Sequence, residues 1–401
     1  RVALVCNDGY IVTYKELKGL VNDFSTYLDG RSLIFLLGSN DLASLVCYLS
    51  SLECEVVPLL LSESIQNEQL NNLIDIYSPK YIFSKKMLDY DSYSLKGNFK
   101  ESNVFSRDEV HDAKLHDDLA LLLTTSGSTG SPKLVKLTKE NIKSNAESIS
   151  EYLKIGCDDR AITSLPFNYS YGLSVINSHL FSGGSIILSN SSMMEDKFWK
   201  SINDHSATSI AGVPYHYEMM LRLGIDNLNI QTVNKMTQAG GKLNYLKAKK
   251  VNDSLRLKGI DFYTMYGQTE ATARISYLPC GNIDKKPNSI GIPIPGGKLW
   301  LEDEQGSKIS DSMVVGELIF EGANVSMGYA ESINDLSSED VNKGILRTGD
   351  LAYFDEDGYY FIEGRNNRFV KVFGNRISLD SLEKLITTKG FDSVATGVDD
   401  K

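Results

Sequence analysis

The sequence has few of the features that mark disulfide-rich, zinc-binding or membrane-spanning proteins. Its five cysteines are Cys6, Cys47, Cys54, Cys157 and Cys280. Their scattered spacing excludes a disulfide framework or a zinc site and favours free thiols in the cytoplasm. The longest apolar region, residues 42–61, is interrupted by Glu53, Glu55 and Pro58, so no membrane span is expected.

Positive charge is also scarce. The chain has 41 Lys and Arg against 52 Asp and Glu, a net charge of -11. This balance argues against a nucleic-acid partner, which requires a basic face to displace counterions. An anionic substrate would therefore need a local cationic site. With 401 residues and 42% hydrophobic content, two or three packed globular units are expected.

Strand-like and helix-like segments alternate along most of the chain, which predicts an α/β protein with parallel sheets. Thr13 and Glu16 form a capping box before a helix of about four turns. The alternation resumes with a strand at 119–123 and a helix from Thr138, which predicts a second doubly wound sheet. From residue 289 to about 365, short β runs separated by turns predict an antiparallel, barrel-like unit, and a last helix is expected at 379–387.

One segment combines hydroxyl side chains, glycines and a lysine directly after the 119–123 strand. Its residues are Thr124, Thr125, Ser126, Gly127, Ser128, Thr129, Gly130, Ser131, Pro132 and Lys133. Hydroxyls and free backbone N–H groups can wrap a polyphosphate while Lys133 supplies positive charge. The spacing is not that of a Walker A loop. An exposed turn is the alternative interpretation, since turns favour the same residues.

Four later segments also carry residues suited to nucleotide chemistry. They are Gln238-Ala239-Gly240-Gly241-Lys242-Leu243, Tyr266-Gly267-Gln268-Thr269-Glu270, Arg347-Thr348-Gly349-Asp350 and Gly364-Arg365. An aromatic ring can cover a base, a hydroxyl can donate to phosphate, and carboxylates bind Mg²⁺ or ribose hydroxyls. Each segment alone also has a plain structural interpretation, as a turn, a core aromatic, a solvated lysine or a surface ion pair.

The five segments together, in this order, resemble the adenylate-forming superfamily of acyl-CoA synthetases, luciferases and peptide-synthetase adenylation domains. The resemblance implies that residues 124–130 and Lys133 hold the triphosphate. In the 266–270 segment, it implies that Tyr266 contacts adenine, Thr269 contacts the α-phosphate and Glu270 helps to hold Mg²⁺. It also implies that Asp350 binds ribose and that Arg365 lies near ribose or phosphate. Gly240, Gly241 and Lys242 would flank adenine and the acyl pocket. Lys133, Thr269 and Glu270 are the expected catalytic residues.

The resemblance also implies a domain division, with an N-terminal adenylation domain at 1–367 and the start of a small α+β C-terminal domain at 368–401. Two departures from the family pattern stand out, because Leu134 replaces a glycine and Asn367 replaces the hinge aspartate. The family's adenylation lysine falls later than Lys401. A truncated C-terminal domain is therefore expected. If the chain naturally ends near residue 401, the alternative interpretation is a non-catalytic nucleotide-binding module.

The candidate acid pocket contains no acidic residue. Amino-acid-activating relatives commonly place an aspartate in the stretch that corresponds to 165–173, to pair with the substrate ammonium, whereas this stretch resembles acyl- and aryl-CoA ligases. The residues expected to line the pocket are Asn168, Tyr169, Tyr171, Gly172, Val213, Pro214 and Tyr215. The expected reaction is ATP- and Mg²⁺-dependent activation of a small carboxylic acid to an acyl-adenylate, with CoA or carrier-protein phosphopantetheine as thiol acceptor. An amino-acid adenylation domain loading a carrier protein is the alternative.

Overall fold

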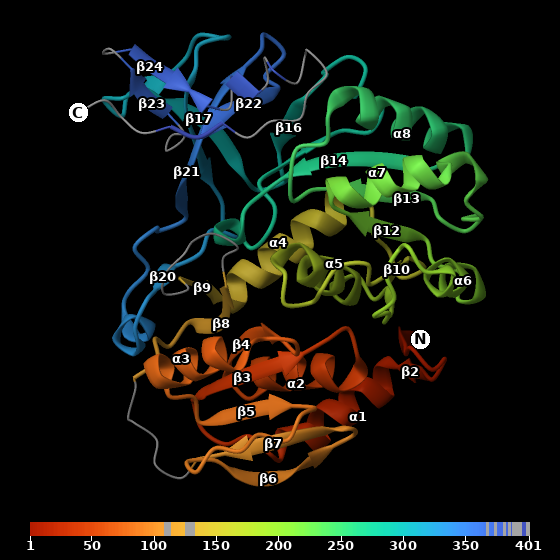
Figure 1. Ribbon diagram of the computed structural model, residues 1–401, viewed down its shortest axis with the longest axis vertical. Coiled ribbons are helices and arrows are strands. Elements are labelled where there is room, and N and C mark those ends of the chain that lie inside the picture. The colour runs from red at the N-terminus through yellow and green to blue at the C-terminus, as the bar shows by residue number, and fades with distance from the viewer. Residues whose placement is uncertain are drawn as a thin grey trace.

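The structure is a computed structural model of the chain (Figure 1). It describes residues 1–107, 114–124, 133–365, 369–372, 375–379, 382–383, 386 and 395–397. The segment 125–132, which is most of the proposed phosphate loop, lies outside the described residues, as does Asn367. The described residues fold as the expected α/β protein with two large mixed sheets.

The first sheet has eight strands in the order β20-β9-β8-β4-β3-β5-β7-β6. Their bounds are β3 (Leu33–Gly38), β4 (Val57–Ser62), β5 (Tyr81–Ser84), β6 (Ser94–Phe99), β7 (Ser102–Ser106), β8 (Leu119–Thr124), β9 (Leu134–Thr138) and β20 (Gly328–Ala330). The expected 119–123 strand is present as β8, but its assignment to a second sheet was wrong. β8 pairs in parallel with β4, with Leu122 opposite Leu59, and so belongs to the first sheet.

The second sheet has fourteen strands in the order β18-β17-β19-β21-β22-β16-β15-β14-β13-β12-β10-β11-β1-β2. Their bounds are β1 (Val2–Val5), β2 (Ile11–Thr13), β10 (Arg160–Ile162), β11 (Ser185–Ile187), β12 (Ser209–Gly212), β13 (Lys235–Gln238), β14 (Asp261–Tyr266), β15 (Ser276–Leu278), β16 (Ser289–Pro293), β17 (Lys298–Glu302), β18 (Lys308–Ile309), β19 (Gly316–Glu321), β21 (Ile345–Phe354) and β22 (Tyr360–Arg365). From β14 onward every pairing is antiparallel, as expected for residues 289–365. Closure of these strands into a barrel stays a prediction.

Helices α4 (Lys139–Tyr152) and α5 (Ser170–Phe181) lie between the two sheets (Figure 1). The full set of helices in the described residues is α1 (Tyr14–Ser25), α2 (Leu42–Glu53), α3 (Asn67–Tyr77), α4 (Lys139–Tyr152), α5 (Ser170–Phe181), α6 (Asp196–Asp204), α7 (Pro214–Leu223) and α8 (Tyr245–Leu257). Three 3-10 turns accompany them: η1 (Ile225–Asn227), η2 (Thr269–Ala271) and η3 (Ile333–Ser337). One buried cluster contains Leu123 of the first sheet, Ile142 of α4, Leu173 of α5 and Ile186 of the second sheet. Burial of this apolar surface fixes the two sheets against α4 and α5.

Local sequence signals set the helix starts. The Thr13 hydroxyl accepts from the Glu16 amide at 3.2 Å, and the Thr13 amide donates to Glu16 Oε2 at 2.8 Å, which is the expected capping box. The helix that follows, α1, ends at Ser25. Thr138 caps α4 in the same way, through reciprocal bonds with Asn141 at 3.0 and 2.9 Å. Both predicted starts are confirmed.

After the second sheet, β23 (Phe369–Val372) pairs antiparallel with β24 (Asn375–Ser378). The expected helix at 379–387 lies largely outside the described residues. Within the described part of the chain, no helix has the length and apolar character required to cross a membrane.

Candidate active site

The Tyr266–Glu270 segment forms a tight turn at the end of β14. Tyr266 is the last residue of the strand, and Thr269 and Glu270 lie in the 3-10 turn η2. The turn packs closely against the backbone that follows it. A Cβ atom at Gly267 would lie only 1.8 Å from the Ala273 carbonyl oxygen, so only glycine fits at this position. The motif glycine thus permits the close approach that orients its neighbours.

Asp350 connects this turn to the antiparallel strands. The Tyr266 hydroxyl donates a hydrogen bond to Asp350 Oδ2, and Gln268 Nε2 donates to the same oxygen at 3.1 Å. Gln268 also donates to the Thr348 carbonyl at 2.9 Å. Asp350 and Arg365 face each other across β21 and β22, with Arg365 Nε 3.3 Å from Asp350 Oδ1. Three motifs that are distant in sequence therefore converge on one carboxylate.

The Asp350 carboxylate is strongly desolvated. It is 4% exposed, and burial raises the pKa of its carboxyl above the usual value, although Tyr266, Arg365 and Gln268 each oppose the rise. Burial and the neighbouring Asp350 raise the pKa of Tyr266 well above its ordinary value. The tyrosine therefore stays a hydrogen-bond donor and the pair is fixed in one arrangement. A fixed carboxylate next to an aromatic ring suits the ribose and adenine of a nucleotide.

Glu270 and Lys133 are connected through Tyr329. The Tyr329 hydroxyl donates to Glu270 Oε1 at 2.7 Å, and Lys133 Nζ lies 5.2 Å from the centre of the Tyr329 ring. Lys133 Nζ also pairs with Glu331 Oε1 at 3.0 Å. The β20–β9 pairing produces this arrangement, because it places Tyr329 opposite Val135. The lysine at the exit of the proposed phosphate loop thus lies close to the candidate metal carboxylate.

The surroundings of Glu270 fit a magnesium ion that is shared with a substrate. Among the described residues, no group of three or more His, Cys, Asp or Glu side chains could hold a metal ion. Mg²⁺ in nucleotide sites usually binds one or two carboxylates and completes its octahedral coordination with phosphate oxygens and water. The Glu270 carboxylate could offer one hard oxygen ligand, and the hydrogen bond from Tyr329 fixes its orientation. These residues fit Mg²⁺ bound together with ATP rather than a resident metal.

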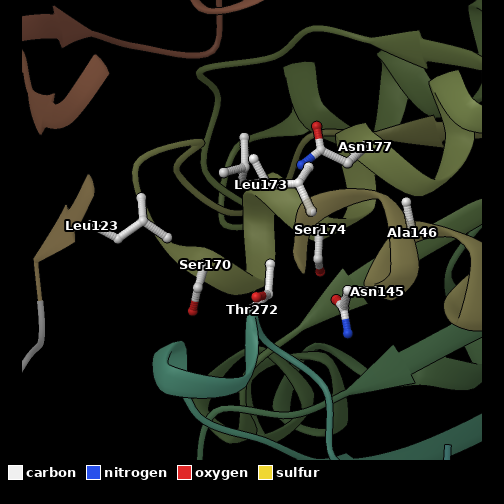
Figure 2. Close-up of a pocket in the computed structure, with 9 residues that line it drawn as sticks. Leu123, Asn145, Ala146, Ser170, Leu173, Ser174, Asn177 and Thr272 are labelled. Carbon is white, nitrogen blue, oxygen red and sulfur yellow. The ribbon is translucent and has the colours of Figure 1, made fainter. Parts of the chain in front are cut away.

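Thr269 contacts Ser170 at the start of α5, and Ser170 lines a small cavity (Figure 2). Its hydroxyl lies 3.2 Å from the Ser170 hydroxyl. The cavity, of about 10 Å³, lies between α4, α5, the end of β8 and Thr272. The buried Asn145 amide nitrogen that lines it has no hydrogen-bond partner among the residues that the structure describes. A volume of this size holds about one water molecule. The cavity is too small for an acid or a nucleotide.

The glycine pair after β13 packs against two residues of the proposed acid pocket. Gly240 has a φ of +78°, and a Cβ atom there would lie 2.4 Å from the Tyr169 hydroxyl and 3.2 Å from Val213 Cγ1. A Cβ atom at Gly241 would lie 3.2 Å from Pro214 Cγ. Both glycines are exposed, whereas Tyr169 and Val213 are half-buried. The structure therefore brings Tyr169, Val213 and the glycine segment together at an accessible surface.

The remaining predicted pocket residues have different environments. Tyr171 is 2% exposed and donates a hydrogen bond to the Thr237 carbonyl at 2.8 Å, so its side chain belongs to the core behind Tyr169. Gly172 packs on the Pro166 carbonyl oxygen, 2.3 Å from where its Cβ would be. Tyr215 is 58% exposed at the start of α7, and Asn168 is half-buried in the turn before α5. Lys242 is exposed beside the glycine pair.

Sequence reasoning missed four residues that organise the site: Tyr329, Glu331, Ser170 and Arg274. None lies in a recognisable motif except Ser170, which stands inside the 165–173 stretch. Arg274 follows the Glu270 turn by four positions and is buried. An arginine so close to the Tyr266–Glu270 segment was the one signal that could have drawn attention to it.

The fold and the site define an adenylate-forming ligase, which activates an acid as an acyl-adenylate with ATP and then passes it to a thiol. The family model described as AMP-binding enzyme matches residues 1–330, and the chain belongs to this family. A D-alanine–D-alanyl carrier protein ligase of Staphylococcus aureus strain Newman is 27% identical over 398 residues, covering 95% of this chain and 78% of the relative.

Solved structures support the same fold. An o-succinylbenzoate CoA synthetase of Bacillus subtilis in complex with the acyl-adenylate OSB-AMP matches with a TM-score of 0.79 at 24% identity, covering 100% of this chain and 83% of the relative. The same synthetase in complex with ATP and a magnesium ion matches with a TM-score of 0.77 at 23% identity, covering 100% of this chain and 85% of the relative. ATP and Mg²⁺ are the cofactors that the motifs predict.

Proposed function

We propose that this chain activates a small carboxylic acid that has no α-ammonium group, forming an acyl-adenylate and releasing pyrophosphate. The thiol of CoA or of a carrier-protein phosphopantetheine then accepts the acyl group. The observation that carries this proposal is the convergence of Tyr266, Gln268 and Arg365 on Asp350, next to the turn that holds Thr269 and Glu270. This arrangement would hold the sugar and base of a nucleotide while hydroxyl and carboxylate groups face its phosphates.

The proposed roles follow from the chemistry of each group. A free carboxylate is a poor electrophile, so its oxygen attacks the α-phosphorus of ATP and pyrophosphate leaves. The Thr269 hydroxyl would donate to the α-phosphate, and Lys133 would bind the β- and γ-phosphates after leaving Glu331. Mg²⁺, when bound at Glu270, neutralises phosphate charge. Donors placed where charge develops are each worth about 2.7 to 4 kcal/mol of barrier in comparable sites.

The loop 124–130 and Lys242 complete the proposed nucleotide site, with Gly240 and Gly241 between adenine and the acid. Tyr169, Val213 and Pro214 would form the wall of the acid pocket, with Asn168 and Tyr215 at its edge. Tyr171 and Gly172 would shape this wall from behind. The proposed domain division at residue 367 and a cytoplasmic location, which the five free cysteines favour, accompany this assignment.

The second candidate is an amino-acid-activating enzyme that loads a carrier protein. The similarity to a D-alanine–D-alanyl carrier protein ligase favours it. Against it stands the stretch 165–173, which contains no carboxylate to pair with a substrate ammonium. A non-catalytic nucleotide-binding module is the third interpretation, and it predicts ATP binding without turnover.

ATP–pyrophosphate exchange separates these candidates. The full-length protein would be assayed with Mg²⁺ and a panel of fatty, aryl and amino acids. The proposal predicts exchange that depends on an acid lacking an amino group. Exchange only with amino acids would establish the second candidate, and ATP binding without exchange for any acid would establish the third.

A further inference from the structure

Asn145 of α4 is a buried residue whose amide nitrogen has no partner among the described residues. It is 2% exposed and lines the cavity between α4 and α5 (Figure 2). Buried amides almost always form hydrogen bonds, because an unsatisfied N–H group costs about 1–3 kcal/mol. The cavity, of about 10 Å³, has room for one water molecule but not for a larger ligand. Asn145 therefore indicates an ordered water molecule inside the fold.

Two hydroxyl residues that line the same cavity can still accept a hydrogen bond, although their protons are already donated elsewhere. The Ser174 hydroxyl donates to the Tyr171 carbonyl at 2.7 Å, and the Thr272 hydroxyl donates to the Asn324 carbonyl at 2.7 Å. A water molecule can accept from the Asn145 amide and donate to hydroxyl oxygens. The cavity thus offers both the size and the polar partners that a buried water molecule requires.

Ser170 connects this cavity to the candidate active site. It lines the cavity, and its hydroxyl lies 3.2 Å from the Thr269 hydroxyl. Neither hydroxyl has a second hydrogen-bond partner among the described residues. The phosphate oxygens of ATP only accept hydrogen bonds, so Thr269 in its proposed role donates its proton to the α-phosphate. The bond between the two hydroxyls then runs from Ser170 to Thr269, and the Ser170 oxygen is left to accept a bond from the cavity.

A short segment after β19 holds α4 against the turn η2. The Asn141 amide nitrogen of α4 donates to the Ala323 carbonyl at 2.7 Å and to the Val325 carbonyl at 2.8 Å. Between these two residues, the Asn324 amide nitrogen donates to the Ala271 carbonyl of η2 at 2.7 Å. Polar groups on α4 therefore keep a fixed position relative to this turn.

We propose that Asn145 and Ser170 are positioning residues, joined by one ordered water molecule in the cavity, that direct the Thr269 proton toward the α-phosphate. The inference rests on the proposed function. The Asn145 amide donates to the water, the water donates to the Ser170 oxygen, and Ser170 donates to Thr269. A donor that is aligned in advance costs no reorganisation when ATP reacts, and successive hydrogen bonds strengthen one another.

Steady-state ATP–pyrophosphate exchange with the full-length protein tests this hydrogen-bond relay. Ser170→Ala and Asn145→Leu should each lower kcat about 3- to 10-fold, the range for loss of one hydrogen bond, while the KM for ATP changes less than about twofold. Ser170→Thr keeps the hydroxyl and should retain the wild-type kcat. Ser178→Ala is the matched control, because Ser178 is a buried serine of α5 that does not line the cavity. Unchanged kcat in Ser170→Ala, or an equal loss in the control, would overturn the inference. Absence of exchange by the wild-type enzyme with every acid would instead overturn the proposed function.

The double variant Asn145→Leu/Ser170→Ala separates a relay from two independent packing effects. Residues of one hydrogen-bond network have non-additive effects, so the double variant should lose little more kcat than Ser170→Ala alone. Losses that multiply would contradict the connection. A high-resolution crystal structure of the wild-type protein checks the water directly. Density for one water molecule within about 3.2 Å of Asn145 Nδ2 is expected, and an empty cavity would overturn the inference.

Discussion

The Tyr329 hydroxyl donates a 2.7 Å hydrogen bond to Glu270, and the two residues are 59 positions apart. Tyr329 belongs to the edge strand β20 of the first sheet, whereas Glu270 follows β14 of the second sheet. The bond therefore joins the two sheets at the candidate metal carboxylate. Burial and the Glu270 carboxylate raise the pKa of Tyr329, so the hydroxyl remains a donor at neutral pH.

Tyr329→Phe removes this donor while keeping the ring. Without the hydroxyl, Glu270 loses the contact that orients it in the proposed Mg²⁺ site, and we expect kcat/KM for MgATP to fall roughly 3- to 10-fold. Tyr10→Phe, at an exposed tyrosine near the N-terminus, is the control. Titration of exchange activity with Mg²⁺ measures the effect, and an unchanged Mg²⁺ dependence in Tyr329→Phe would remove Tyr329 from the site.

Lys133 is held by Glu331 at 3.0 Å, and both side chains are about half exposed. In the proposed role of Lys133, ATP would compete with Glu331 for the lysine. An exposed ion pair is worth about 0–1 kcal/mol, so Glu331→Gln should lower the KM for ATP by up to about fivefold. Lys133→Ala should raise it about 10-fold or more. Steady-state exchange kinetics measure both changes, with Lys139→Ala as the control lysine. The KM for ATP must therefore change in opposite directions in the two variants. A rise in both would exclude competition between ATP and Glu331 for Lys133.

Gly240→Ala places a methyl group only 2.4 Å from the Tyr169 hydroxyl oxygen. Tyr169 must move, so we expect the KM for the acid to rise more than the KM for ATP. Gly306→Ala is a closely matched control, because Gly306 has the same φ of +78° with no atom within 4 Å of its Cβ position. Both variants carry the backbone penalty of about 1–2 kcal/mol. Equal kinetic effects in the two variants would show that Tyr169 does not form the acid pocket.

His179 makes stability depend on pH. Burial lowers the pKa of this histidine to about 4 from the ordinary 6.5, while its ring nitrogens contact the Val175 carbonyl at 2.8 Å and the Ser209 hydroxyl at 3.2 Å. Because the folded state favours the neutral ring, the contribution of His179 to the free energy of unfolding is complete above pH 6.5. It is lost as the pH falls from 6.5 toward 4. Between pH 7.5 and 5 the loss is roughly 2 kcal/mol.

Denaturant unfolding at the two pH values measures the loss. His179→Gln should have lower stability at pH 7.5 but a smaller pH dependence than wild type. His205→Asn, at a half-exposed histidine, should keep the wild-type pH dependence. If His179→Gln keeps the full wild-type pH dependence of stability, titratable groups other than His179 cause that dependence.

Local features of the sequence predicted much of the fold. The capping residues Thr13 and Thr138 fixed two helix starts, because a cap depends on neighbours three positions away. The strand at 119–123 was predicted, but its sheet was not, because that depends on pairing with β4 far earlier in the chain. The same limit applies to the site. Tyr266 and Asp350 were expected separately, whereas their mutual hydrogen bond spans 84 residues.

Residues outside motifs were beyond sequence reasoning for a related reason. Tyr329 reaches Glu270 only because β20 pairs with β9, and no local pattern encodes that pairing. Arg274 reads as an ordinary charged residue until its burial is seen. Hydrophobic periodicity predicts which face of an element is buried, but it does not predict which buried polar group lacks a partner.

The most direct test of acid adenylation follows the oxygen atoms. The full-length enzyme would turn over an acid labelled with ¹⁸O in its carboxylate, with MgATP and a thiol acceptor, and mass spectrometry would locate the label. Attack of the carboxylate on the α-phosphorus leaves one labelled oxygen in the AMP released by the thiol. We therefore predict singly labelled AMP and unlabelled pyrophosphate. Label in inorganic phosphate with formation of ADP, or AMP without label, would contradict the account.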